Sequence, residues 1–231
     1  MSELEDLTLF HDIWILANDS DDTIGFHRAY LIDKWRIAAD WKNDVLKIDL
    51  PLKLLLYIKT WAYTNVLQIS NNPRQSFELL EASKIINSLH LENAVLLDLK
   101  SNIAVGNVVE ILNYAHDRKM KSLTRAALCH LLAHFETVYQ NHTEKLVLKL
   151  SLPILIHLLS SSHLVCNSED HIFDLVAMVE HHRREFITDH DLLQLFKCVR
   201  YSQLRFQVSQ HLVGFSMQLQ KFVSNICGQD R

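Results

Sequence analysis

The scarcity of glycine and proline constrains this chain more than any other feature. Only four glycines and three prolines occur in 231 residues. Both residues disfavour the interior of a helix, glycine because its backbone is too free and proline because it lacks an amide donor. We therefore expect a mostly helical protein. With 48% hydrophobic residues the chain can bury a proper core, and its length corresponds to one or two domains.

The N-terminal segment departs from this helical pattern. Residues 11–16, HDIWIL, prefer β-structure, and the following ANDSDD consists largely of turn-forming residues. TIGFHRAYL at 23–31 can return as a second strand that leads into a helix, so the two runs predict a β-hairpin. A third strand is predicted at 45–50, VLKIDL, because its apolar residues alternate until Pro51 ends the run.

Helical spacing of apolar residues begins at Leu52 and continues toward the C-terminus. Pro73 lies where the first turn of a helix tolerates proline. Apolar stripes that are predicted to face a core run over residues 77–89, 108–115, 123–138, 152–159, 172–179, 192–199 and 204–222. Because these helices differ in length and pattern, no solenoid repeat is predicted.

The segment at 152–176, LPILIHLLSSSHLVCNSEDHIFDLV, allows two interpretations, a catalytic serine loop or a joint between helices. A nucleophile of the G-x-S-x-G kind needs flanking glycines, and this segment has none. The serines at 160–162 instead suit a helix end, and Ser168 suits the cap of the next helix. Thr188 followed by Asp191 repeats the capping pattern. We expect a helix joint, no catalytic residue and no enzyme.

Candidate metal and cofactor sites are weak in this sequence. His130 and His134 lie four residues apart without an H-E-x-x-H pattern. Asp19, Asp21 and Asp22 lack the glycine and glutamate of a calcium loop, which favours a solvated hairpin turn. The four cysteines form no CxxC pair and the four glycines never cluster, which excludes a zinc knuckle and a phosphate-binding loop. We expect no metal, no cofactor and reduced thiols.

Charge and hydropathy limit which partners and which cellular compartments are expected for the protein. A formal net charge of -4 argues against a nucleic-acid-binding protein, which needs clustered lysine and arginine. No signal peptide is expected, and no run of about 18 apolar residues could span a bilayer. These features predict a cytoplasmic or nuclear protein that binds neither nucleic acid nor membrane.

All four tryptophans lie between residues 14 and 61. Side chains of this size are usually buried in a small domain, and a partly exposed cluster marks an interface. We favour the core for Trp14 and Trp61. Trp35 and Trp41 stand beside charged residues, and both interpretations stay open for them.

Several segments resemble a BTB/POZ domain followed by a BACK domain, as in the Kelch-like proteins. HDIWIL resembles the first BTB strand, FHRAYL the start of the next helix, and TWAYTNVLQIS the Tyr-Thr-Gly segment, with Asn65 where glycine is usual. LPILIHLLSSSHLVCNSEDHIFDLVAMV resembles the leucine-rich helix, polar turn and capped helix of BACK, and LLQLFKCVRYSQL its Leu-x-x-Cys-Val-Arg-Phe ending. The resemblance implies an α+β fold, with a three-layer BTB/POZ-like strand-helix domain at 1–104. An all-α BACK-like domain with a C-terminal helix would occupy 105–231, and no Kelch repeats occur in the sequence.

The same resemblance implies a non-enzymatic substrate adaptor of a cullin-RING ubiquitin ligase, whose partners are the third cullin and a substrate protein. BTB domains of this family commonly form homodimers, and Asp12 and Arg28 match the charged pair near the dimer interface. A bidentate arginine–carboxylate pair fixes orientation at such a contact. Trp41-Lys42-Asn43 lacks the acid of the hydrophobic-x-Glu signature linked to cullin contact. A self-associating scaffold without ubiquitin transfer therefore stays open as the alternative.

Overall fold

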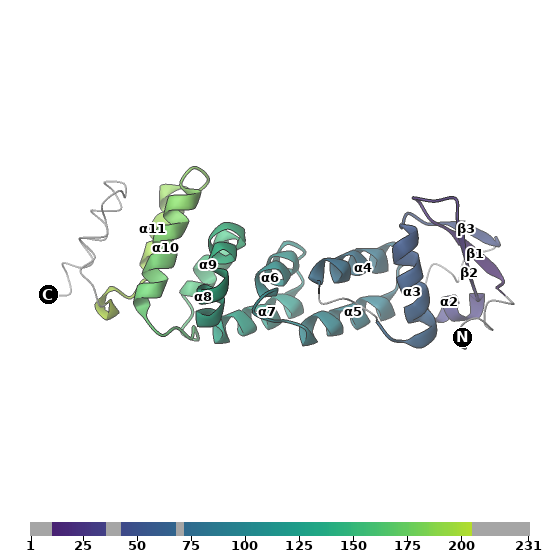
Figure 1. The fold of residues 1–231 in the computed structure, drawn as a ribbon, viewed down its shortest axis with the longest axis horizontal. Helices are drawn as coiled ribbons and strands as arrows, with labels where there is room; N and C mark the ends of the chain where they lie inside the picture. The colour runs from purple at the N-terminus through teal and green to yellow at the C-terminus, as the bar shows by residue number, and fades with distance from the viewer. Residues whose placement is uncertain (1–10, 36–42, 68–71, 205–231) are drawn as a thin grey trace. The chain divides into compact units, whose positions relative to one another are not determined.

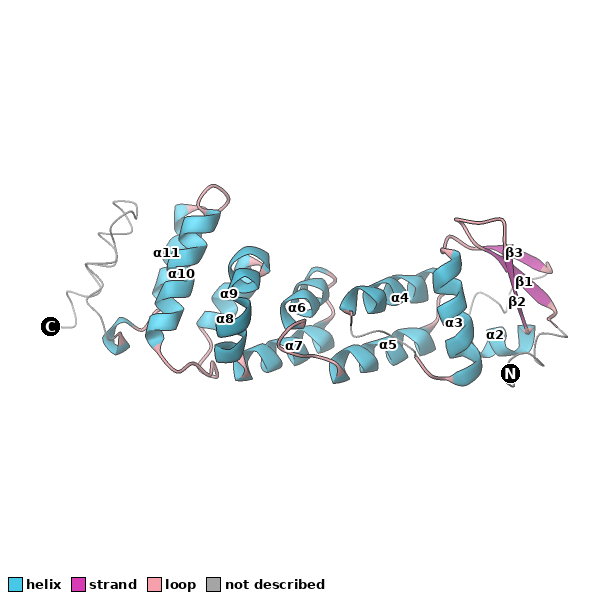
Figure 2. Ribbon diagram, in the orientation of Figure 1, coloured by secondary structure: helices cyan, strands magenta, loops and turns pink. Residues whose placement is uncertain are grey.

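The computed structural model describes residues 11–35, 43–67 and 72–204. The chain divides into two compact units, Met1–Asn102 and Ile103–Arg231. The first unit combines a small sheet with helices, and the described part of the second unit is helical (Figure 1, Figure 2). The described residues are mostly helical and include one small sheet, which is consistent with the predicted α+β class. The helix predicted at 204–222 lies outside the described residues, apart from its first position.

The sheet of the first unit has three strands in the order β2-β1-β3. These strands are β1 (Ile13–Leu16), β2 (Thr23–Phe26) and β3 (Val45–Lys47). β1 pairs antiparallel with β2, which confirms the predicted hairpin, and it pairs parallel with β3. β3 ends earlier than predicted because the chain bends there, where the Leu50 amide donates to the carbonyl of Ile48.

Alternation along β1 decides which of its side chains enter the core. Ile13 and Ile15 are fully buried, whereas Trp14 between them is 42% exposed. Successive side chains of a strand point to opposite faces, so two buried isoleucines place Trp14 on the outer face. The prediction of a buried Trp14 is therefore wrong.

Two helices pack against this part of the fold, α2 (Arg28–Lys34) and α3 (Leu52–Thr64). Trp61 of α3 is buried as predicted, and Trp35 at the end of α2 is also buried, while Trp41 lies outside the described residues. α3 ends at Asn65, which adopts a left-handed conformation with φ of 55°. Asparagine tolerates this conformation better than most side chains, so it can end the helix at a position where the resemblance expects glycine.

The first unit is completed by α4 (Pro73–Ile85) and α5 (Leu89–Ser101). The stripe over 77–89 predicts one continuous buried face, and this prediction is wrong. The chain turns at Asn87, whose φ is 52°, and Ile85 and Leu89 on either side are 41% and 49% exposed. Ser88 then caps α5 and donates a hydrogen bond to the Lys34 carbonyl at 2.6 Å, which ties the joint to α2.

The second unit begins with α6 (Val108–Asp117), α7 (Lys121–Ala133), α8 (Phe135–Glu144) and the π-helical turn η3 (Lys145–Lys149). It continues with α9 (Leu152–Leu159), α10 (Glu169–Arg183), α11 (Asp189–Lys197) and the short 3-10 turn η4 (Tyr201–Gln203). The stripe predicted over 123–138 is buried, but it belongs to two helices that meet at His134. No described helix is both long and apolar enough to cross a membrane.

Local side-chain bonds fix where the last helices begin. Ser168 accepts the amide of Asp170 at 3.2 Å, and Thr188 accepts the amide of Asp191 at 3.2 Å, so both predicted caps are confirmed. Between these helices the rings of Phe173 and Phe196 meet edge to face with centroids 6.2 Å apart. The caps set the helix starts, and this aromatic contact joins α10 to α11.

Candidate functional site

Asp12 and Arg28 come together where α2 begins. The Asp12 carboxylate accepts the backbone amide of Arg28 at 2.6 Å and so supplies an acceptor to an unpaired helix amide. The Arg28 guanidinium lies 3.6 Å from Asp44, whose side chain is 85% exposed, and donates to the Asn43 carbonyl at 3.4 Å. The two residues are neighbours as the resemblance implies, and the hydrogen bond described here runs through the backbone of Arg28. Their role at a dimer interface stays a prediction.

A group of aromatic rings lies in the same unit, next in sequence to Asp12 and Arg28 or in contact with those neighbours. The Tyr63 hydroxyl accepts the amide of His27 at 2.9 Å and lies 2.8 Å from its Nδ1. Ring centroids lie 5.9 Å apart for His11–Trp14, 5.1 Å for His11–His27 and 5.0 Å for Tyr30–Tyr63. Trp14 and Tyr30 are 42% and 46% exposed. This aromatic surface, formed by His11, Trp14, His27, Tyr30 and Tyr63, has the half-exposed rings that protein interfaces favour.

Burial affects the titrating groups within the aromatic surface. Burial, then the nearby charges of Lys59 and His27, lowers the pKa of His11 below 6.5, although Asp12 opposes this. Burial also raises the pKa of Tyr63 above 10.0 against the hydrogen bond from His27. A neutral His11 and a protonated Tyr63 suit a contact made by rings and hydrogen bonds more than by charge.

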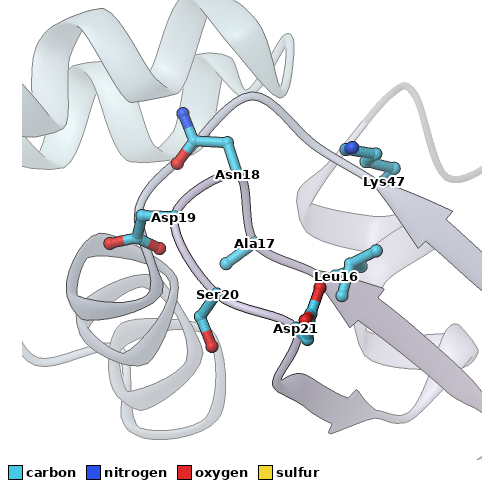
Figure 3. A pocket seen from close by; sticks show the side chains of 7 residues that line it. All are labelled: Leu16, Ala17, Asn18, Asp19, Ser20, Asp21 and Lys47. Carbon is cyan, nitrogen blue, oxygen red and sulfur yellow. The ribbon is translucent and has the colours of Figure 1, made fainter.

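The acidic turn between β1 and β2 serves the fold. Figure 3 shows a small hollow there, lined by residues 16–21 and Lys47, in which Asp19 and Asp21 point to different sides. Asp19 accepts the Leu52 amide at 2.8 Å and so satisfies an unpaired amide in the first turn of α3. Asp22 accepts the Ser20 hydroxyl at 2.7 Å. These contacts confirm the interpretation of this segment as a hairpin turn.

The serine-rich joint between α9 and α10 is held by its own short contacts. Ser160 donates to the His157 carbonyl at 3.2 Å, and the Ser161 hydroxyl accepts the amide of His163 at 3.2 Å. Ser168 forms the cap already described. The joint interpretation of this segment is confirmed.

His130 and His134 lie close together, as their spacing predicts. Their ring centroids are 4.5 Å apart, and within the described chain the Nε2 of His130 is buried without a hydrogen-bond partner. Burial and the neighbouring His134 lower the pKa of His130 below 6.5. No third ligand group accompanies this pair in the described residues.

A different cluster forms where the joint meets α8 and α10. Glu136 in the first turn of α8, Cys166 in the joint and His171 in the first turn of α10 place one ligand atom each within 4.8 Å of one another. The Glu136 Oε2 lies 3.2 Å from the His171 Nδ1 and 3.6 Å from the Cys166 Sγ. The sequence patterns of histidine pairs, CxxC pairs and calcium loops do not include this cluster, because Glu136 lies 30 residues before Cys166. The Cys-x4-His spacing was the signal that could have found it.

Hydrogen bonds hold the Glu136 carboxylate in place. It accepts the amide of Asn167 at 3.2 Å and the side-chain amide of Gln140 at 3.0 Å. Burial would raise the pKa of Glu136, but the bonds from Asn167 and His171 outweigh it and hold that pKa below 4.5. Burial raises the pKa of Cys166 to about 11, and the Glu136 charge adds to this rise. Cys166 is thus a protonated thiol and not an activated nucleophile.

Comparison with known proteins gives an independent view of the second unit. Residues 108–214 match the family model BACK, described as BTB And C-terminal Kelch. The chain contains a BACK domain. The BACK domain includes the serine-rich joint, both helix caps and the cluster of Glu136, Cys166 and His171. No curated protein matches the chain.

The BACK domain indicates the class of proteins in which such a chain is found. This domain is associated with Kelch-like BTB proteins, which act as adaptors and are generally non-enzymatic. The part of the resemblance that lies in residues 108–214 is therefore confirmed. The BTB/POZ assignment of residues 1–104 stays a prediction.

Proposed function

We propose that this protein is a substrate adaptor of a cullin-RING ubiquitin ligase. The observation that carries the proposal is the BACK domain at 108–214, because this domain is associated with adaptor proteins of the Kelch-like BTB type. A BTB/POZ-like first unit would bind the third cullin, and another surface of the chain would bind a substrate protein. The protein would act in the cytoplasm or the nucleus.

Three features of the first unit support the BTB/POZ part of the proposal. HDIWIL contains β1, and FHRAYL spans the end of β2 and the start of α2, at the positions where the resemblance expects a strand and a helix. α3 ends at Asn65, in the segment that resembles Tyr-Thr-Gly. The aromatic surface then offers exposed rings beside Asp12 and Arg28, the pair expected near a dimer interface.

The mechanism needs no residue that makes or breaks a bond. An adaptor holds a substrate near the enzyme that transfers ubiquitin and so raises the effective concentration of the substrate. The rate of ubiquitin transfer then depends on the affinities of the adaptor for the cullin and for the substrate, and on the geometry of the assembly.

Binding to a purified N-terminal domain of the third cullin tests the proposal. We expect the whole chain to bind with a micromolar or lower Kd by isothermal titration calorimetry. Trp41→Ala, at the hydrophobic position of Trp41-Lys42-Asn43, should weaken binding at least about tenfold, as removal of an interface anchor does. Phe186→Ala, at an 85% exposed aromatic residue of the second unit outside the aromatic surface, is the control. Absence of heat at concentrations where a micromolar complex forms would contradict the proposal.

The alternative is a self-associating scaffold without ubiquitin transfer. It is favoured by the missing acid after Trp41 and by the aromatic surface beside Asp12 and Arg28. Sedimentation velocity of the whole chain should then show a dimer that Arg28→Ala weakens. This variant keeps the backbone amide that binds Asp12, so it tests the guanidinium without removing the start of α2. Phe186→Ala, an 85% exposed residue of the second unit, is the control.

A further inference from the structure

The cluster of Glu136, Cys166 and His171 joins three segments of the BACK domain at one point. The first turn of α8, the joint after α9 and the first turn of α10 contribute one side chain each. Glu136 and His171 are 13% and 33% exposed, and Cys166 is half-buried, so the cluster lies below the surface while solvent can still reach it. An exposed group of acids would not have this enclosure.

Two of the three ligand-atom pairs have the spacing of a metal coordination sphere, and the Cys166 Sγ and His171 Nδ1 lie within 4.8 Å of each other. Zinc bonds of about 2.0 Å to oxygen and nitrogen and about 2.3 Å to sulfur place tetrahedral ligands about 3.3–3.6 Å apart. The corresponding distances are 3.2 Å from the Glu136 Oε2 to the His171 Nδ1 and 3.6 Å from it to the Cys166 Sγ. Small movements of these side chains would therefore complete the geometry.

The chemistry of the donors selects the ion. Thiolate and imidazole ligands favour zinc over calcium and magnesium, which prefer oxygen, and carboxylate is a common third zinc ligand. We propose that Glu136, Cys166 and His171 bind one Zn²⁺ ion, with water in the fourth position. The ion links α8, the serine-rich joint between α9 and α10, and α10.

Neighbouring groups already orient two of the three ligands, Glu136 and His171. Gln140 and Asn167 donate to the Glu136 carboxylate, and Tyr139 stacks on the His171 ring with centroids 5.0 Å apart and an interplanar angle of 22°. Outer partners of this kind fix ligand orientation in known metal sites. On binding, the Cys166 thiol and the His171 Nδ1–H that faces Glu136 each give a proton to solvent, and the His171 ring takes or keeps a proton on Nε2, so that Nδ1 offers its lone pair to the ion. This site is independent of ubiquitin-ligase function and of the first unit.

Metal titration of the whole chain tests the proposal. After treatment with a chelator and its removal, calorimetry should show one tightly bound Zn²⁺ per chain, and the melting temperature should rise with added Zn²⁺. Co²⁺ in place of Zn²⁺ should give an intense thiolate-to-metal charge-transfer band, which surface histidines cannot produce. Absence of this band in the unmodified chain overturns the proposal, whatever the variants do.

Matched variants assign the ligands. Cys166→Ser and His171→Phe should each weaken Zn²⁺ binding more than about 100-fold, beyond what loss of an outer partner costs. His171→Phe keeps a ring to stack on Tyr139, and circular dichroism checks that each variant is folded. Cys198→Ser, at another half-buried thiol, should bind like the unmodified chain. If Cys166→Ser binds Zn²⁺ as tightly as the unmodified chain, the metal lies on other residues. If neither the unmodified chain nor any variant binds Zn²⁺, the cluster is held by hydrogen bonds alone. Either result refutes the site.

Discussion

Replacement of Ser168 by alanine tests whether this serine stabilises the N-terminus of α10 by capping it. The Ser168 hydroxyl accepts the Asp170 amide at 3.2 Å and donates to the Asp170 carboxylate at 2.8 Å. Loss of an N-cap serine typically costs about 1 kcal/mol of stability, within a range of about 0.5–2 kcal/mol. The second bond, to a charged group, places Ser168→Ala in the upper half of that range, at about 1.5 kcal/mol.

Urea unfolding followed by far-ultraviolet circular dichroism measures this cost. With an m-value of about 2 kcal/mol/M, the midpoint of the BACK-domain transition should fall by about 0.7 M. Ser168→Thr keeps the hydroxyl and should recover most of the loss. Ser160→Ala is the matched control, because Ser160 is exposed and donates only to a helix carbonyl. An unchanged midpoint in Ser168→Ala, or an equal loss in Ser160→Ala, would refute the capping argument.

Two further predictions concern the core and the response to pH. Phe173→Ala should destabilise the BACK domain by about 3–5 kcal/mol in the same urea assay, because Phe173 is 1% exposed and packs against Phe196. Phe186→Ala, at an 85% exposed site, should change stability by less than about 0.5 kcal/mol, and similar losses in both variants would contradict the described core. Burial and His134 lower the pKa of His130 below its unfolded value of 6.5, so the unfolded chain takes up this proton first and stability falls as pH drops through the folded pKa. When the pH is lowered from about 7.5 to about 5.5, His130→Leu should lose less stability than the unmodified chain. His163→Leu, at an exposed position, is the control and should lose as much stability as the unmodified chain. Equal losses in His130→Leu and the unmodified chain would show that His130 is not responsible.

Features set by neighbouring residues could be predicted from the sequence. The caps at Ser168 and Thr188 span two or three residues, so the pattern alone determines the bond. The β1–β2 hairpin likewise follows from two short β-preferring runs around a polar turn. The spacing of Val108, Ile111, Leu112 and Ala115 also predicts the buried face of α6 correctly.

Features that depend on tertiary packing could not be predicted in this way. Hydrophobicity alone placed Trp14 in the core, but the pairing of β1 decides which face is buried. The break at Asn87 needs a left-handed backbone conformation, which an apolar stripe does not reveal. Glu136 lies 30 residues before Cys166 and 35 before His171, so only the packing of α8 against the joint and α10 brings them together.

The sequence separates its natural optical and chemical probes between the two units. All four tryptophans lie within Met1–Asn102, and all four cysteines lie within Ile103–Arg231. Excitation of tryptophan therefore reports on the first unit alone, while a thiol-reactive dye at exposed Cys129 labels the BACK domain. Resonance energy transfer from the indoles to that dye can follow the separation of the two units in solution, and its change when a partner is added, without any engineered residue.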